Sequence, residues 1–565
     1  MKERELRLFS ALSDLGDDLV LESGAFVPGL AAGGVSGAAK VSEMLPVRTV
    51  KRPAWFLPTA VTACVAVVVT VGILVGVLGQ SFGVFPVKPP EVTTDEVSDA
   101  SDTTDTTDTE ETETANETAE DTANDTVTEE SVEEETESDC VVEEQNYGLP
   151  FTVLYCSDTF DKAYDLGLDD GGAAVLSEAA YGRIHKAETH LGVKVSAVDG
   201  GGGSGYYGTL VSSAMAGKDD YQWILTHGYK SLASLMTSSY LLDLKAVEGF
   251  DGKSGYLSSA ENERLTVSGK QLVAYHDFLL PDGYVLRFDR DMVNGMMGDG
   301  TLYGLVEEHG WTLEVMASYV TAFGDGSGET YGLSCAGDLS VAAFVTSSDI
   351  RVLDHAGNRI TLTAMADSER GAAMDSLLHG LSESRALYAY DPGDGHTPIR
   401  VGSGDVAFEA VSLRELLQGG GGVDIGILPY PLYDGNQAEY RMLYVGGYMA
   451  VPCTVQHREM VRDVLEVLAY ESGTVREAYL AAVWSAGGCT SLRDRAMLDL
   501  VADSMTVEQG LVLMDVHTRM EAIVMAIPRH LEGDGAYAVN VPYLWSQMSG
   551  KIDDLVRKVG ALSST

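Results

Sequence analysis

The sequence predicts an α/β outer domain with two lobes, preceded by one transmembrane helix and an acidic linker. Three observations lead to this prediction. An uncharged apolar run, Phe56–Gly79, is long enough to cross a bilayer as a helix. A stretch rich in acidic residues, 91–144, follows it. From Tyr147 onward short apolar strands alternate with helices, and the remaining chain of about 420 residues suits two lobes better than one core.

The chain is strongly acidic, with 85 Asp and Glu against 37 Lys and Arg in 565 residues, which gives a net charge of −48. Residues 91–144 hold 23 of the acids and no Lys or Arg, so removing those charges from −48 leaves about −25 for the rest. A nucleic-acid partner is disfavoured, because phosphate binding relies on a basic surface.

The apolar run is predicted to be a signal anchor, with residues 1–52 as a cytoplasmic head and residues 53–80 as the transmembrane helix. No charged side chain lies between Arg52 and Lys88, and the basic residues cluster on the N-terminal side of the run. The positive-inside rule therefore places the N-terminus in the cytoplasm and the C-terminal domain outside the cell membrane. A cleaved signal peptide is disfavoured, because about fifty residues precede the run.

Residues 81–146 are predicted to be a disordered linker. Thr, Glu, Asp and Ser dominate the segment, and no aromatic residue occurs from Pro86 to Asn146. Such a sequence has little apolar surface to offset the entropy cost of ordering, and its like charges repel one another. We expect the linker to hold the outer domain away from the membrane.

The outer domain, 147–565, begins with an alternation of strands and helices. The pattern predicts strands at 151–155, 193–198 and 223–226, with helices at 173–191 and 207–216 between them. This order is typical of a largely parallel sheet. In such sheets ligands bind beyond the carboxyl ends of the strands.

Two loops are expected at those strand ends, Asp199–Tyr207 and Thr226–Tyr229. The first matches a dinucleotide-binding glycine pattern, but a run of glycines matches it trivially. A dinucleotide site would also want an acidic residue at the end of the next strand, where His227 stands instead. We therefore expect no nucleotide cofactor and interpret the glycine loop as the edge of a cleft.

Several motifs resemble the extracellular solute-binding protein family 1. They are the strand and helix start GYVLRFDRDM at 283–292, the segment HGWTLE at 309–314, and DIGILPYP at 424–431 with the following YD and QAEY. The N-terminal segment also resembles the short cytoplasmic heads of clostridial single-pass membrane proteins. Members of the family are commonly sugar receptors for ABC importers.

The resemblance implies a two-lobed, type II periplasmic-binding-protein-like fold that traps a solute between hinged lobes. Lobe one would comprise about 147–282 and 443–488, and lobe two about 284–440 and 490–565. Backbone rotation is expected at Pro281–Gly283 and Gly446–Gly447. The family's usual Asn and Lys at the end of the first strand motif are Asp289 and Arg290 here, and we interpret both positions as structural.

The implied function is capture of a small solute, a sugar above all, for an ABC permease or a signalling membrane partner. No HExxH, CxxC or GxSxG motif is present, so no catalytic residue and no metal ligand is assigned. A membrane-anchored hydrolase and a scaffold or sensor that binds no solute remain as alternatives.

A sugar site needs aromatic platforms and planar hydrogen-bonding groups. Six residues are the candidate ligand contacts: Tyr206, Tyr207, His227 and Tyr229 in lobe one, Glu409 in the strand VAFE of lobe two, and Trp484 in a Gly- and Ser-containing break between helices. Each also has a structural alternative. Tyr206 and Tyr207 would cap a helix, Tyr229 would be a core residue, and Trp484 would pack a helix end.

Five cysteines lie outside the predicted membrane span: Cys140, Cys156, Cys335, Cys453 and Cys489. Their odd number leaves at least one unpaired. A bridge between Cys140 and Cys156 is the most plausible local pair, and a fully reduced set is the alternative.

Overall fold

The computed structural model describes residues 142–168, 174–248, 260–298, 300–356, 359–363, 369–392, 395–419, 423–531 and 537–563. The predicted head, the transmembrane helix Phe56–Gly79 and the linker up to residue 141 lie outside this part of the chain. No helix within the described ranges is both long enough and apolar enough to span a membrane.

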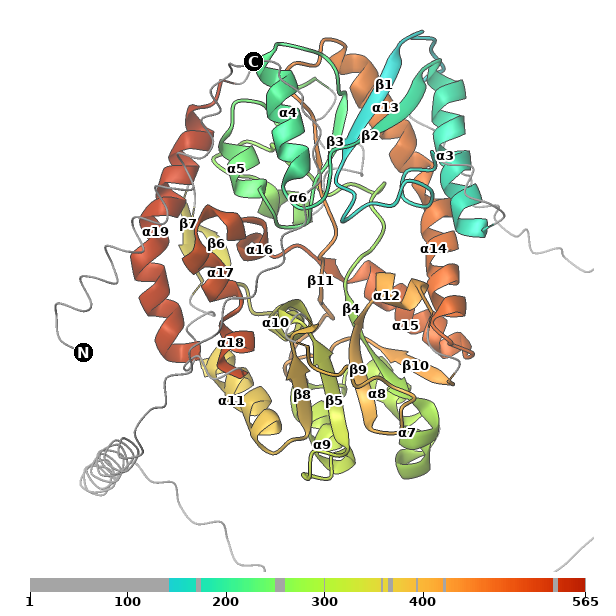
Figure 1. Ribbon diagram of the computed structural model, residues 1–565, viewed down its shortest axis with the longest axis vertical. Helices are drawn as coiled ribbons and strands as arrows, with labels where there is room; N and C mark the ends of the chain where they lie inside the picture. Colours follow the sequence, from blue (N-terminus) through green and yellow to red (C-terminus); the bar gives the residue numbers. More distant parts are fainter. Residues whose placement is uncertain are drawn as a thin grey trace, which may run out of the picture. The chain divides into compact units, whose positions relative to one another are not determined.

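Lobe one begins with the predicted alternation (Figure 1). Its elements are β1 (Pro150–Tyr155), α3 (Val175–Leu191), β2 (Lys194–Asp199), α4 (Gly205–Met215), β3 (Trp223–Leu225), α5 (Leu232–Thr237), η1 (Leu244–Ala246) and α6 (Ala260–Leu265). The five predicted elements are confirmed, with ends that differ by one or two residues. Strand β1 pairs in parallel with β2 and β3, and β12 (Met449–Ala450) closes the sheet antiparallel to β3.

Lobe two contains the second sheet and the helices that pack against it. Its elements are β4 (Tyr284–Asp289), α7 (Arg290–Met297), α8 (Thr301–Glu307), α9 (Leu313–Phe323), β5 (Tyr331–Ala336), α10 (Asp338–Ser347), β6 (Leu353–Ala356), β7 (Arg359–Leu362), α11 (Glu369–Glu383), β8 (Leu387–Tyr390), β9 (Val406–Ser412), α12 (Leu413–Leu417) and β10 (Ile425–Leu428).

The two sheets share one strand pattern. Their orders are β2-β1-β3-β12 and β8-β5-β9-β4-β10. In the first sheet β1 pairs in parallel with β2 and β3, and β12 runs antiparallel to β3. In the second sheet β5 pairs in parallel with β8 and β9, and β4 runs antiparallel to β9. The second sheet has one further strand, β10, which pairs antiparallel to β4. Four strands of each sheet therefore share one arrangement in a mixed α/β structure.

The remaining elements connect the lobes. They are β11 (Met442–Leu443), α13 (Arg458–Tyr470), α14 (Ser472–Ala486), α15 (Leu492–Asp503), β13 (Met505–Thr506), α16 (Gln509–Val512), η3 (Met514–Val516), α17 (Thr518–Val524), α18 (Ala526–Leu531) and α19 (Tyr537–Ala561). Helices α13 and α14 pack against α3, whereas α16, η3 and α19 contact α5 and α6 of lobe one as well as β6, β7 and α11 of lobe two.

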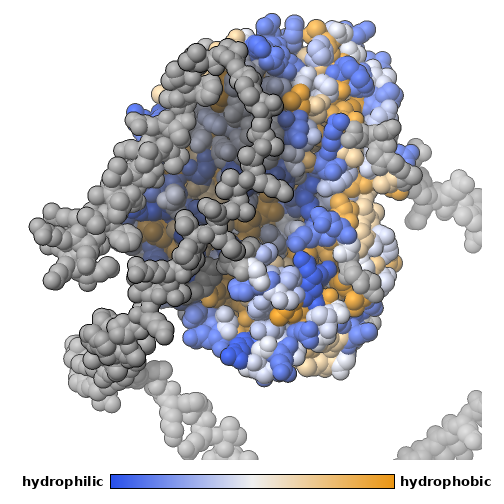
Figure 2. All heavy atoms as spheres, viewed as in Figure 1, coloured by the Kyte–Doolittle hydropathy of each residue, from blue (hydrophilic) through white to orange (hydrophobic). Residues whose placement is uncertain are grey.

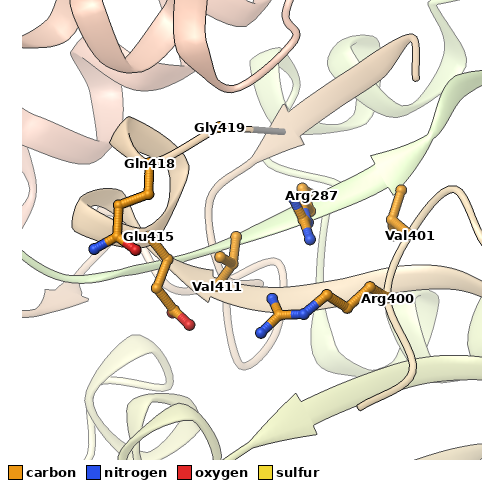
Figure 3. A pocket seen from close by; sticks show the side chains of 7 residues that line it. All are labelled: Arg287, Arg400, Val401, Val411, Glu415, Gln418 and Gly419. Atoms are coloured by element: carbon orange, nitrogen blue, oxygen red, sulfur yellow. The ribbon is translucent and has the colours of Figure 1, made fainter. Parts of the chain in front are cut away.

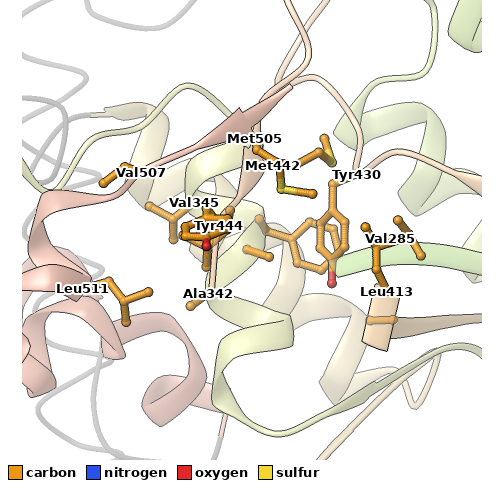
Figure 4. Close-up of a cluster of buried hydrophobic side chains, with 14 of the residues drawn as sticks. Val285, Ala342, Val345, Leu413, Tyr430, Met442, Tyr444, Met505, Val507 and Leu511 are labelled. Atoms are coloured by element: carbon orange, nitrogen blue, oxygen red, sulfur yellow. The ribbon is translucent and has the colours of Figure 1, made fainter. Parts of the chain in front are cut away.

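Two chain segments cross between the lobes side by side. Gly283 forms an antiparallel bridge with Tyr444, and the Val445 N–H donates to the Asp282 carbonyl at 2.9 Å. A Cβ at Gly283 would lie 2.6 Å from the Leu443 carbonyl oxygen, so the close approach requires glycine. Buried side chains from β4, α10, α12, β11 and β13 meet around this crossing (Figure 4). The predicted hinge segments lie in or next to these crossings.

The residues that depart from the family motif have structural roles. The Asp289 carboxylate accepts the Met292 N–H at 2.9 Å and caps α7, a task for which Asn and Asp are equally suited. Arg290 is buried and pairs with Asp494 at 2.6 Å, and Asp494 also accepts a hydrogen bond from the Tyr303 hydroxyl. The structural interpretation of both positions is confirmed.

The ordered domain starts earlier than the sequence predicts. Residues 142–146, assigned to the linker, lie against the end of α3, where the Gln145 N–H donates to the His190 carbonyl at 3.0 Å. The Tyr147 hydroxyl then donates to Asp463 on α13 at 2.5 Å. Cys156, Cys335, Cys453 and Cys489 are free thiols, while Cys140 lies outside the described residues.

Two glycines test how tightly lobe two is packed. A Cβ at Gly332, in β5, would overlap the backbone carbonyl of Val320 on α9, which cannot move aside. We expect Gly332→Ala to destabilise the domain by about 1–3 kcal/mol or more. Gly304, in α8, has open space where a Cβ would project, so Gly304→Ala is the matched control and should stabilise by about 0.5–1 kcal/mol. Urea unfolding of both variants checks the difference, and equal stabilities would contradict it.

Candidate ligand site

The glycine loop after β2 is held by its own acidic neighbours. The Gly201 N–H donates to Asp199 at 2.7 Å, and the Gly203 N–H donates to Asp158, in the loop after β1, at 2.6 Å. Gly203 has a φ of +58°, which glycine adopts without strain. Two N–H groups that a phosphate would need are therefore already bound to carboxylates, which agrees with the prediction that this loop binds no dinucleotide.

The loop after β3 brings three of the predicted residues together. The buried His227 ring accepts backbone N–H groups from Tyr229 at 3.2 Å and Lys230 at 3.4 Å through Nδ1. Its ring centroid lies 4.7 Å from that of Tyr229, edge to face. The Tyr206 hydroxyl donates to the Lys230 carbonyl at 2.9 Å. Burial, helped by Lys230, lowers the pKa of His227 to about 4, so the imidazole is neutral at pH 7 and can accept both bonds.

Contacts between the lobes show that the carboxyl ends of their strands meet. Arg414, the second residue of α12, donates to both oxygens of Asp165, in the loop after β1, at 3.0 Å each. Its Nε also donates to Asp282 in the crossing segment at 2.7 Å. Burial is the main cause of the raised pKa of Tyr284, at the start of β4. The Tyr229 phenol of lobe one lies close enough to raise this pKa further. On the face drawn in Figure 2 hydrophilic and hydrophobic side chains are intermixed at the surface.

A cavity of about 400 Å³ opens beside the carboxyl end of β9. Its walls come from β4, β9, α12 and the loop before β9 (Figure 3). The lining residues are Arg287, Arg400, Val401, Val411, Glu415, Gln418 and Gly419. The cavity therefore combines charged and amide groups with two apolar valines.

Glu409 lies beneath this cavity and binds two arginines that line it. The buried carboxylate accepts hydrogen bonds from Arg287 Nε at 2.9 Å, Arg287 Nη2 at 2.7 Å, Arg400 Nη1 at 3.1 Å and the Val401 N–H at 2.8 Å. Three of these donors meet Oε2 and one meets Oε1, so most of the acceptor capacity of the carboxylate is used within the protein. Glu409, which the sequence predicts to contact the ligand, instead binds the side chains of Arg287 and Arg400. Of these two arginines, Arg400 faces the open space of the cavity.

Arg400 and Glu415 provide complementary groups at the cavity. The Arg400 side chain is 49 % exposed and points toward the Glu415 carboxylate (Figure 3). Glu415 is fixed because its Oε2 accepts from the Ser412 N–H and hydroxyl at 3.0 and 3.1 Å. Tyr390, at the end of β8, stands near both, and its pKa is raised chiefly by burial. A guanidinium, a carboxylate and an amide suit a neutral solute that carries several hydroxyl groups.

The other predicted contacts lie apart from the cavity. Tyr206 is fully buried in the core, and Tyr207 is half-buried on the same helix. Trp484 lies in the last turn of α14, so the expected break between helices begins after it rather than around it. Its Nε1 donates to the Ser491 carbonyl at 3.1 Å, which fits the helix-end alternative.

None of the seven lining residues was among the predicted contacts, and the polar ones that the sequence reasoning missed are Arg287, Arg400, Glu415 and Gln418. One signal could have found the first of them. Arg287 in YVLRF and Glu409 in VAFEAV are each a single charge within an apolar run, and two such strands of opposite charge are expected to pair. No comparable signal marks Arg400, which lies in an irregular loop.

Within the described ranges no group of His, Cys, Asp and Glu side chains is arranged to hold a metal ion.

No protein-family model matches the chain, and no curated protein matches it. Solved structures of sugar-binding proteins are similar. The cyclic α-maltosyl-1,6-maltose binding protein of Arthrobacter globiformis is 14% identical over 74% of this chain and 99% of its own, with a TM-score of 0.48. The galacto-N-biose/lacto-N-biose I-binding protein of Bifidobacterium longum is 13% identical over 74% and 98%, with a TM-score of 0.48. The GacH receptor of Streptomyces glaucescens is 13% identical over 72% and 100%, with a TM-score of 0.47.

The neutral state of His227 predicts a pH effect on stability. Its folded pKa of about 4 lies below the ordinary 6.5, so between these values the unfolded chain binds more protons than the folded one. Stability should therefore fall as pH drops from about 6.5 to about 4. In His227→Asn the amide oxygen can accept the same N–H groups without titrating, so this fall should be shallower. Thermal unfolding from pH 4 to 8 measures it, and identical profiles for both chains would contradict the assignment.

The ion pair between Arg287 and Glu409 predicts that substitutions of its two members have non-additive effects on the free energy of unfolding. Arg287→Met leaves Glu409 buried with only Arg400 and the Val401 N–H, and should destabilise the domain by about 3–5 kcal/mol. The double variant Arg287→Met with Glu409→Leu removes both charges and should cost less than the single variant. Urea unfolding of the three chains measures this, and a double variant less stable than Arg287→Met would refute the pairing.

Proposed function

We propose that the protein is a membrane-tethered extracellular solute-binding protein that captures a small carbohydrate between two lobes without changing it chemically. The captured form would be recognised by an ABC permease or by a signalling partner in the membrane. The two sheets, whose strands meet at their carboxyl ends, support this proposal because ligands of open α/β sheets bind at such edges.

The observation that carries the binding of a solute is the polar cavity at the end of β9, whose lining residues all belong to lobe two. A sugar needs donors and acceptors in fixed positions around its hydroxyls, and Arg400 and Glu415 are each held by a second group. Fixed polar groups lose little freedom when a ligand binds.

The proposal of a membrane tether is based on the sequence. The apolar run Phe56–Gly79 would anchor the chain, and the acidic linker would give the outer domain reach. Since the anchor is a helix with a cytoplasmic head, the captured solute could be reported to a partner on either side of the membrane.

A thermal-shift screen of the full chain against mono- and oligosaccharides tests the function. A binder should show an unfolding temperature that rises with sugar concentration, because the ligand binds only the folded state. Chromatography of the same mixtures should recover the sugar unchanged. A cleaved product would favour the hydrolase, and no shift with any sugar would refute carbohydrate capture.

Arg400 should carry a large share of the affinity. Arg400→Ala removes an exposed guanidinium while Glu409 keeps Arg287, so the fold should persist and sugar affinity should fall about ten- to a hundredfold. Arg359→Ala is the matched control, since Arg359 on β7 is exposed and far from the cavity lining. Calorimetric titration measures both, and equal loss in the two variants would contradict the site.

A further inference from the structure

The segment 505–512, which contains β13 and α16, is bonded to elements of both lobes. The Val507 N–H donates to Glu261 on α6 at 2.5 Å. The Gln509 amide nitrogen donates to the Arg264 carbonyl at 2.7 Å and lies 2.8 Å from His355 Nε2 on β6. We infer that this segment is a proton-sensitive joint, which holds α6 of lobe one to β6 of lobe two and loosens when Glu508 loses its proton.

Glu508 occupies the centre of the joint. Its side chain is buried and accepts the Gly510 N–H at 2.9 Å, and it also accepts the backbone N–H of Val352 just before β6. One carboxyl group therefore ties the start of α16 to lobe two. The contact between Gln509 and His355 is a second link between this segment and lobe two.

The charges around Glu508 do not neutralise it. The titratable and charged groups that face it or line the adjoining space are Glu261, Glu263 and Arg264 on α6, Lys245 on η1, Arg351, Asp354 and His355 at β6, and Tyr448 beside β12. Arg264 is already paired with Glu261 at 2.8 Å. Within the part of the chain that the structure describes, no lysine or arginine forms an ion pair with Glu508.

Burial without a cation favours the protonated acid. Burial raises the pKa of Glu508 from 4.5 to about 7, while the two N–H bonds and the nearby arginines oppose the rise. The folded joint therefore keeps a proton that an open joint would release between about pH 4.5 and 7. Its stability falls as pH rises through this window and changes no further well above it.

A cavity next to the joint gives water access to it. This cavity of about 740 Å³ lies between α6 and β6, lined by Arg264, Arg351 and His355 among others. Residues on both walls belong to the elements that the joint connects. Water in this space can exchange protons with the joint without unfolding the domain.

Hydrogen exchange of the full chain at pH 6 and pH 8 tests the inference. After correction for intrinsic rates, protection of the amides in 505–512 should fall about tenfold in the native chain, as expected for a group with folded and open pKa values of about 7 and 4.5. Glu508→Gln, which mimics the protonated acid, should abolish the fall. Glu263→Gln, an exposed carboxyl on α6, is the matched control and should behave as the native chain.

Three results would overturn the inference. One is constant protection of 505–512 between pH 6 and pH 8 in the native chain, which stays decisive even if Glu508→Gln does not fold. Another is an undiminished fall in Glu508→Gln. The third is an equal fall in amides of β1 and β2, because that pattern reports global rather than joint destabilisation.

Discussion

The arrangement of the two lobes depends on the guanidinium of Arg414. It satisfies Asp165 from lobe one and Asp282 from the crossing segment, and all three side chains are largely removed from water. Taking one of these charges away would leave the others buried without compensation, so the ion cluster specifies one relative position of the lobes rather than simply adding stability. Any opening of the lobes has to part Arg414 from Asp165 or to move both together.

The same helical turn also forms the cavity wall. Ser412 and Glu415 make a reciprocal cap at the start of α12, which fixes the orientation of the whole turn. Arg414 consequently faces lobe one while the neighbouring Glu415 faces the cavity. A short helix of five residues therefore couples the contact between lobes to the geometry of the polar site.

The buried carboxylates differ in whether a neighbouring arginine balances their negative charge. Glu409 and Asp494 each have at least one arginine in contact, and Asp165 shares one with Asp282. Among the described residues Glu508 has only backbone donors, so its state depends on protonation rather than on an ion pair.

Local patterns in the sequence predicted the first five elements of lobe one, because the alternation of short apolar runs with helix-forming stretches is encoded by neighbouring residues. Pairings across long stretches of chain were not predictable in this way. Arg287 and Glu409 are 122 residues apart, and only the strand order brings them together. The aromatic residues chosen as ligand contacts illustrate the other limit, since a tyrosine such as Tyr206 fits a core as well as a site and only burial distinguishes the two.

The way the chain enters the domain has a mechanical consequence. Gln145 and Tyr147 attach the segment before β1 to the end of α3 and to the middle of α13. Tension arriving from upstream would pass through these bonds into the helices of lobe one. Arg183 on α3 donates to the Asp165 carbonyl at 2.5 Å, and the Asp165 carboxylate binds Arg414, so a pull on this end of the domain would reach the contact between the lobes.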